Sequence, residues 1–91
     1  MYQVVFSSKY KKSLKKISKS GNFPRKEIEE VITFLISGKI LPVKYLDHGL
    51  HGEFAGYREC HIKGDLLLVY KIEKNDLILV LIDIGSHSEL F

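Results

Sequence analysis

Histidine and aspartate side chains in the second half of the sequence are the residues best suited to carry chemistry. His61 and Asp65 flank a predicted turn, so they are expected to be near neighbours whatever the exact strand register. His48 lies in a glycine-rich loop, and His87 directly follows the last predicted strand. A strand meander can bring these positions to one rim of a sheet. Because imidazole both donates and accepts protons near neutral pH, this set predicts general acid–base chemistry.

RNA cleavage is one reaction that such a set of groups can catalyse. One group takes the proton of the 2′-hydroxyl, and another protonates the departing 5′-oxygen. The transition state also requires a nearby cation, and Arg58 is the closest arginine in the sequence to these histidines.

Two other uses of the same residues are less well supported. His48 and His51 have an HxxH spacing, but Gly49 between them argues against the helix that would place both on one face. Cys60 directly precedes His61, so in a strand the two side chains point to opposite faces and the imidazole is poorly placed to activate the thiol. We therefore expect no metal, no cofactor and a buried structural cysteine.

The elements that position these residues follow from the hydrophobic periodicity. Residues 2–6 are β-branched and aromatic, which predicts a short strand. Serines at 7–8 offer an N-cap for a helix over about 8–20, which Gly21 and Asn22 should end. A second helix is predicted to follow, with an apolar stripe at helical spacing formed by Ile28, Val31, Ile32, Leu35 and Ile36.

The ends of the second helix and the strands beyond it are marked by glycine and proline. Pro24 suits the first turn of that helix, and Gly38 suits its C-terminal cap. Residues 39–52 have no sustained period and predict a connecting loop. Strands are predicted over 54–62, 66–72 and 77–84, with a bulge at Gly56 and tight turns at 63–65 and 75–76.

The order of elements is strand, helix, helix and three strands. It predicts an α+β fold in which two helices pack on one face of an antiparallel sheet of about four strands. Periodicity leaves open whether the first strand joins parallel or antiparallel. The tail GSHSELF is long enough for one helical turn, with Ser86 as a candidate cap for Glu89.

Composition indicates one globular domain over residues 1–91. Hydrophobic residues make up 45 % of the 91 positions and charged residues 27 %, which excludes a disordered tail or a disulfide-stapled mini-protein. Residues 1–45 carry ten Lys/Arg and three Glu, whereas residues 46–91 carry four Lys/Arg and eight Asp/Glu, so the net charge of +3 combines +7 with −4. The basic half suggests a polyanionic partner or a solvated helix face. No apolar run is long enough to span a membrane and no signal-peptide order is present, so a cytoplasmic protein without membrane contact is expected.

Two segments of the second half carry a family resemblance. DHGLHGEFAGYRECHIKGDLLLVYKI and GSHSELF resemble, at fixed spacings, the YafQ branch of the RelE/ParE superfamily of toxin–antitoxin toxins. The resemblance covers about the last 45 residues, and the first half agrees with it in element order. It implies a RelE-like fold and a metal-independent, ribosome-dependent mRNA endonuclease that inhibits translation. It also implies a DinJ-like antitoxin as partner, with mRNA and ribosomal RNA bound in the ribosomal A site.

The resemblance also implies roles for particular residues. The family's active-site positions fall on His48, His61, Asp65, His87 and Phe91. His87 would be the general acid, His61 with Asp65 the base or orienting pair, His48 a phosphate contact and Phe91 a stacking platform for a base. Contacts to RNA phosphates would come from Arg58, Lys9, Lys12, Lys15, Lys16 and Lys19.

Two positions depart from the pattern. Leu66 stands where tryptophan is frequent, and Asp83 stands where arginine is frequent. A carboxylate close to the scissile phosphate would repel it, so either the site rearranges or Arg58 and the lysines supply the positive charge. The alternatives to an active nuclease are therefore a ParE-like gyrase inhibitor and a catalytically weakened toxin that only binds RNA or antitoxin.

Overall fold

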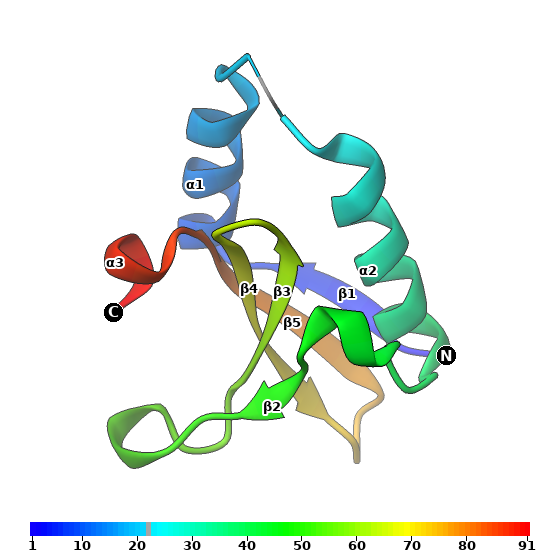
Figure 1. Cartoon of the computed structure of the whole chain (residues 1–91). Helices are drawn as coiled ribbons and strands as arrows, with labels where there is room; N and C mark the ends of the chain where they lie inside the picture. The colour runs from blue at the N-terminus through cyan, green and yellow to red at the C-terminus, as the bar shows by residue number, and fades with distance from the viewer. Residues whose placement is uncertain (22) are drawn as a thin grey trace.

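A five-stranded sheet with strand order β1-β5-β4-β3-β2 forms the centre of the molecule (Figure 1). The computed structural model describes residues 1–21 and 23–91, so the predicted role of Asn22 in ending the first helix lies outside the described residues. The strands are β1 (Gln3–Phe6), β2 (His48–Gly49), β3 (Arg58–Lys63), β4 (Leu66–Glu73) and β5 (Ile78–Gly85). The predicted α+β class is confirmed. The predicted number of strands was one too low, because the two residues of β2 are too few to produce an alternating pattern.

The first strand joins the sheet parallel to the last one. β1 pairs with β5 in the register Gln3↔Ile78 to Phe6↔Leu81, whereas the pairs β2–β3, β3–β4 and β4–β5 are antiparallel. The parallel pairing settles the direction that periodicity had left open. It also brings residues near the two ends of the chain side by side.

Two helices supply the second layer of the fold. α1 (Ser8–Ser18) begins at the N-cap Ser7, whose hydroxyl accepts from the Tyr10 amide at 3.0 Å and donates to the Ile82 carbonyl at 2.7 Å. α2 (Arg25–Ser37) ends at Gly38, which has the left-handed φ of +76° that favours glycine. Both predicted helices are present, but α1 ends at Ser18 with Lys19 as its C-cap, earlier than the predicted end at Gly21. Pro24 stands at the N-cap of α2 rather than within its first turn.

One buried cluster joins both helices to one face of the sheet. It contains Tyr10 of α1 and Val31 of α2 together with alternate residues of the central strands, among them Cys60, Leu68 and Leu79. The expectation that two helices cover one face is therefore confirmed. The opposite face is covered only in part, and it carries the polar residues considered below. Among the described residues, no helix is long and apolar enough to cross a membrane.

The segment between α2 and β3 departs most from the prediction. The predicted connecting loop contains the 3₁₀ turn η1 (Val43–Tyr45) and then β2. β3 begins at Arg58 rather than at residue 54, because a second 3₁₀ turn, η2 (Gly52–Phe54), and a turn at Gly56 with φ +93° precede it. The irregularity predicted at Gly56 is thus part of the turn. The register shift within β3 lies between His61 and Lys63.

A hydrogen-bond network around Asp47 ties this segment to the sheet. The Asp47 carboxylate accepts from the Arg58 guanidinium, with Nη2 at 3.1 Å and Nε at 3.4 Å, and from the hydroxyl of Tyr70. Burial, reinforced by the hydrogen bond to Asp47, raises the pKa of Tyr70, and the same carboxylate raises the pKa of Arg58. Tyr70 therefore remains a neutral donor and Arg58 a cation throughout the physiological pH range.

Replacement of Tyr70 by phenylalanine should destabilise the protein measurably. Tyr70 is 1 % exposed, and Tyr70→Phe removes its hydrogen bond to a carboxylate, so we expect the free energy of unfolding to fall by about 1–2 kcal/mol. Urea unfolding followed by circular dichroism measures this change. Tyr45→Phe is the matched control, because the buried Tyr45 donates at 2.9 Å to Glu30, whose residue is exposed to solvent. Equal losses in the two variants would contradict a special contribution from the Asp47 network.

Cys60 should be chemically inert in the folded protein. The residue has no exposed surface, and burial, together with the charges of Asp47 and Glu59, raises the pKa of its thiol to about 12. Because the thiolate is the nucleophile that attacks a disulfide reagent, we expect no reaction with such a reagent at about pH 8 under native conditions. One thiol per chain should react after unfolding in guanidinium chloride. Rapid labelling of the native protein would show that Cys60 is accessible.

Candidate active site

A row of residues in register runs across the face of the sheet opposite the main core. The pairings His48↔Glu59, Glu59↔Val69 and Val69↔Asp83 connect β2, β3, β4 and β5. Cross-strand partners present their side chains on the same face, so His48, Glu59, Val69 and Asp83 form one line. The next row consists of His61↔Leu67 and Leu67↔Gly85. Two of the predicted site histidines therefore lie on one surface.

Glu59 is the buried carboxylate between these two histidines. Its residue is 4 % exposed, and its Oε1 lies 3.6 Å from Nε2 of His48 and 3.6 Å from Nε2 of His61. The two imidazole rings are 6.4 Å apart between centroids. Each ring can therefore exchange a proton beside a fixed negative charge, which suits acid–base chemistry.

The backbone fixes which nitrogen of His48 faces the carboxylate. Nδ1 of His48 lies 2.8 Å from the carbonyl oxygen of Leu46, which can only accept a hydrogen bond, so Nδ1 carries a hydrogen. Nε2 is then the nitrogen that gains or loses a proton, and it is the one turned toward Glu59. The contact between His48 and Glu59 is an ion pair only when His48 is protonated.

Sequence reasoning did not select Glu59. The useful signal was its position two residues before His61 in a strand, because side chains at i and i+2 share one face. In the segment between Tyr57 and His61, the sequence pointed instead to Arg58 as a cation and to Cys60 as a thiol. Glu59 now occupies the place beside His61 that the sequence had assigned to Asp65.

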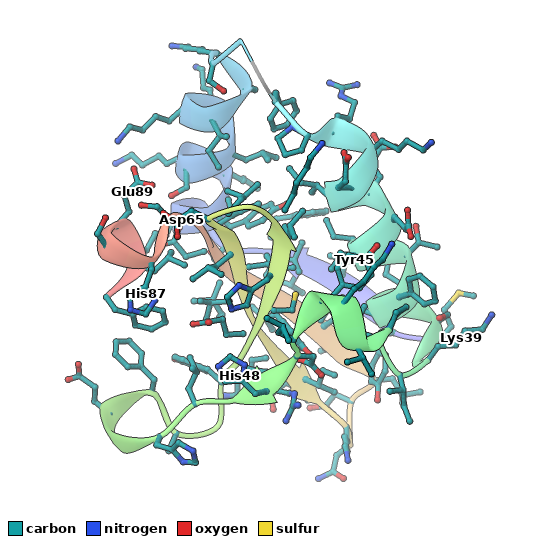
Figure 2. The ribbon with its side chains drawn as sticks, viewed as in Figure 1. Lys39, Tyr45, His48, Asp65, His87 and Glu89 are labelled. Carbon is teal, nitrogen blue, oxygen red and sulfur yellow. The ribbon has the colours of Figure 1, made fainter. Side chains whose placement is uncertain are left out.

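Asp65 itself lies in the turn between β3 and β4. The residue is exposed, and within the described ranges its side chain forms no hydrogen bond or ion pair with His61 or His87. Figure 2 shows it at the tip of the turn, with α3 (His87–Leu90) beside it in this view. The structure thus places Asp65 near the rim but does not join it to an imidazole.

His87 and Phe91 come from the last turn of the chain. Ser86 and Glu89 form a reciprocal capping box, as the sequence indicated, and the hydrogen bond from the Ser86 amide lowers the pKa of Glu89. This cap holds the single turn that carries His87. The centroid of the Phe91 ring lies 5.3 Å from that of His87 and 5.2 Å from that of Phe54, and the two phenyl rings are perpendicular.

Figure 2 shows His87 and His48 at separate edges of the same face. His87 is exposed, and Phe91 is 46 % exposed, so both are open to a ligand. Gly85 connects the His61 row to this turn, and its lack of a side chain leaves room for Glu89, whose Oε1 would lie 3.2 Å from an added Cβ.

Arg58 is not on this face. It pairs across strands with Tyr70 and binds Asp47, whereas its neighbour Glu59 points to the opposite side. The predicted cation beside the histidines is therefore engaged elsewhere. Arg58 holds β2 and β3 together, and through them it positions His48 opposite Glu59.

Asp83 is buried at the end of the polar row nearest to α1. Its Oδ1 accepts from the hydroxyl of Ser13 at 2.6 Å and from the amide of Ile84 at 2.8 Å, and its Oδ2 lies 3.5 Å from Nζ of Lys9. The negative charge that the sequence analysis expected to repel a phosphate is thus paired with a lysine.

The lysines of α1 divide into two groups. Lys9 and Lys16 point toward the site and pair with Asp83 and Glu89, each at 3.5 Å. The others on the solvent side are exposed, and in the described part of the chain none of them has an ion-pair partner: Lys11, Lys12, Lys15 and Lys19. The helix therefore presents an uncompensated positive surface to solvent.

Across residues 1–21 and 23–91, no group of three or more His, Cys, Asp and Glu residues has the arrangement of a metal site. His48 and His51, the HxxH pair considered from the sequence, differ in surroundings: His48 faces Glu59, and His51 is exposed at the cap of η2.

Known proteins resemble the chain over its whole length. Residues 2–91 match the family described as "Bacterial toxin of type II toxin-antitoxin system, YafQ". The "mRNA interferase toxin YafQ" of Escherichia coli K12 is 34 % identical over 89 residues, which are 97 % of this chain and 94 % of that protein.

Solved structures agree with this assignment. A metal-bound toxin from Helicobacter pylori is 45 % identical, with a TM-score of 0.92 and full coverage of both chains. A chain of the E. coli DinJ–YafQ complex is 29 % identical, with a TM-score of 0.88, and the match covers 100 % of this chain and 99 % of that one. The fold and the family match lead to one conclusion: the chain belongs to the YafQ family of bacterial toxins of type II toxin–antitoxin systems.

Proposed function

We propose that this toxin is a ribosome-dependent mRNA endonuclease that cleaves RNA by general acid–base catalysis and so inhibits translation. The observation that carries the proposal is the Glu59 carboxylate between His48 and His61 on one open face, with His87 at the edge of the same face. The E. coli relative that is 34 % identical bears the name mRNA interferase, which supports the same activity here.

The reaction begins with the 2′-hydroxyl of the RNA. His61 takes its proton, the 2′-oxygen forms a bond to phosphorus, and the bond from phosphorus to the 5′-oxygen breaks. His87 donates a proton to the departing 5′-oxygen. The products are a 2′,3′-cyclic phosphate and a 5′-hydroxyl, and the proton transfers require no metal ion.

The other site residues bind and orient. Glu59 orients both imidazoles, because its Oε1 lies 3.6 Å from Nε2 of each ring. Nε2 of His48 contacts the phosphate. Asp65, at the rim, is the second candidate for the base or its orienting partner, and the half-exposed ring of Phe91 stacks on a nucleobase.

The basic face of α1 holds the larger partner. Lys12, Lys15 and Lys19 are exposed cations without ion-pair partners among the described residues, which suits contact with ribosomal RNA phosphates. Lys16, although paired with Glu89, keeps a side chain that is 80 % exposed and extends the same surface. We infer strong salt dependence of binding to the ribosome.

A DinJ-like antitoxin is the proposed protein partner. In the E. coli DinJ–YafQ complex, DinJ is the partner of YafQ, and the matched chain of that complex covers 100 % of the present chain. An antitoxin with acidic segments would complement the lysines of α1. Inhibition and RNA binding would then compete for one surface.

Replacement of His87 by alanine should remove most of the cleavage activity. The variant lacks the proton donor to the 5′-oxygen, and general acid catalysis is worth about 10²–10⁴-fold in rate. Cleavage is measured on programmed ribosomes, and 5′ ends of transcripts are mapped in cells after induction. His51→Ala is the matched control, because His51 is exposed on the η2 segment and has no part in the mechanism.

The same experiment separates the alternatives. Wild-type protein that arrests growth but cuts no RNA would overturn the nuclease, and inhibition of gyrase supercoiling would then indicate the ParE-like activity. Full activity of His87→Ala would overturn only the assignment of the acid. Activity that persists in EDTA would support a metal-independent reaction, and its loss would contradict one.

Replacement of Glu59 by glutamine tests the residue that the sequence did not reveal. The substitution keeps the size of the side chain and removes the charge that both imidazoles contact, so we expect cleavage to slow by about 10–100-fold. Thermal unfolding should confirm that the variant is folded. Glu53→Gln, on the exposed η2 turn, is the control and should cleave like the parent. Unchanged cleavage by the Glu59 variant would show that the two histidines act without the carboxylate.

A further inference from the structure

The proposed reaction needs a cation beside the scissile phosphate, and neither arginine of the chain can supply it from its observed position. Arg58 binds Asp47 on the other face of the sheet. Arg25 begins α2 and lines a groove with Phe6, Tyr10 and other residues of the helices. Of the arginine and lysine side chains, a lysine is therefore the one that can supply a permanent cation on the histidine face.

Lys9 is the lysine that the fold places at the end of the polar row. It extends from the first turn of α1, and its Nζ lies 3.5 Å from Oδ2 of Asp83. Lys9 and Asp83 line one small cavity of about 40 Å³ together with Val69, Phe54 and Phe91. Lys9 thus shares a cavity with the aromatic residue that we assign to base stacking, and its ammonium group lies beside Asp83, the last residue of the row that contains His48 and Glu59.

Asp83 is built to hold a lysine in place. Its side chain is 8 % exposed, and its Oδ1 is already occupied by Ser13 and by the Ile84 amide. Only Oδ2 remains for Lys9, so the position of the carboxylate is fixed by both the helix and the strand. A lysine ammonium has three donors, and a side chain that is 71 % exposed can give one to Asp83 and the others to a phosphate.

We propose that Lys9 contacts the scissile phosphate and that Asp83, fixed by Ser13, is the positioning residue for Lys9. The inference rests on the proposed function, since it assigns a role within the same site. Asp83 then does not act by repelling the phosphate, as the sequence suggested. Its carboxylate instead orients Lys9 of α1 toward the phosphate. The cation thereby comes from the N-terminal half of the chain and the acid–base groups from the C-terminal half.

Lys71 provides a matched control on the same face. As the residue two positions after Val69 in β4, it shares the face of the polar row, and its Nζ pairs with Glu73 at 3.1 Å. Its ammonium lies 6.0 Å from the centre of the Tyr57 ring, on the side of the His48 row away from His61. Lys9→Met and Lys71→Met therefore remove the same charge from two ends of one surface.

The test is a cycle that pairs a protein variant with an RNA variant. Full-length toxin binds ribosomes programmed with an mRNA whose A-site codon carries 2′-O-methyl riboses, which block attack on the phosphate. A neutral methylphosphonate replaces each linkage of that codon in turn. At one linkage, we expect the methylphosphonate to weaken binding of wild-type toxin and of Lys71→Met by about tenfold, the effect of losing one charge-assisted hydrogen bond. Lys9→Met should bind the neutral and charged linkages equally.

Catalysis on unmodified mRNA gives the second readout. Lys9→Met should lower kcat by about tenfold or more, Lys9→Arg should retain most of the rate, and Ser13→Ala should lower kcat less than Lys9→Met does. A methylphosphonate effect that is the same in Lys9→Met and in wild type, or a loss of kcat equal to that of Lys71→Met, would overturn the inference. Wild-type toxin that leaves unmodified mRNA intact would overturn the proposed function, while the binding cycle would still decide the contact of Lys9.

Discussion

The ion pair between Asp47 and Arg58 is the interaction on which the geometry of the site depends. Asp47 directly precedes His48 and Arg58 directly precedes Glu59, and neighbouring residues of a strand point to opposite faces. The ion pair and the Tyr70 hydroxyl hold β2 against β3 on one face. On the other face, the same register sets His48 opposite Glu59. A two-residue strand could not maintain this alignment through its backbone hydrogen bonds alone.

Two buried carboxylates position the cationic and protonatable side chains of the candidate site. Glu59 and Asp83 are both buried, and both belong to the row that crosses four strands. Each faces cationic or protonatable groups: Glu59 faces two imidazoles, and Asp83 faces a lysine and a hydroxyl donor. Burial of a carboxylate is costly without such partners. The partners are therefore held where a negatively charged substrate would meet them.

The sequence predicted the elements whose hydrophobic pattern repeats over many residues, and it missed the features that depend on a single contact. The α2 stripe and the two apolar strands β4 and β5 were found because burial of a whole face repeats over many residues. β2 escaped detection because its two residues are held by Asp47, a tertiary contact that no local pattern encodes. His48, His61 and His87 were selected by residue type, and the structure does bring the first two together. The side of the sheet on which Arg58 lies, and the place of Glu59 between the imidazoles, required the register of β3.

The parallel pairing of β1 with β5 has a consequence for folding during translation. β1 is translated before the other strands, but its partner residues 78–81 are translated only after both helices and strands β2 to β4. The hydrogen bond from the Ser7 hydroxyl, which caps α1, to the carbonyl of Ile82 likewise forms only after β5 has been translated. Contacts of such high sequence separation form late in folding. The sheet that aligns the site therefore closes only after β5 has been translated, so the site cannot form on a shorter nascent chain.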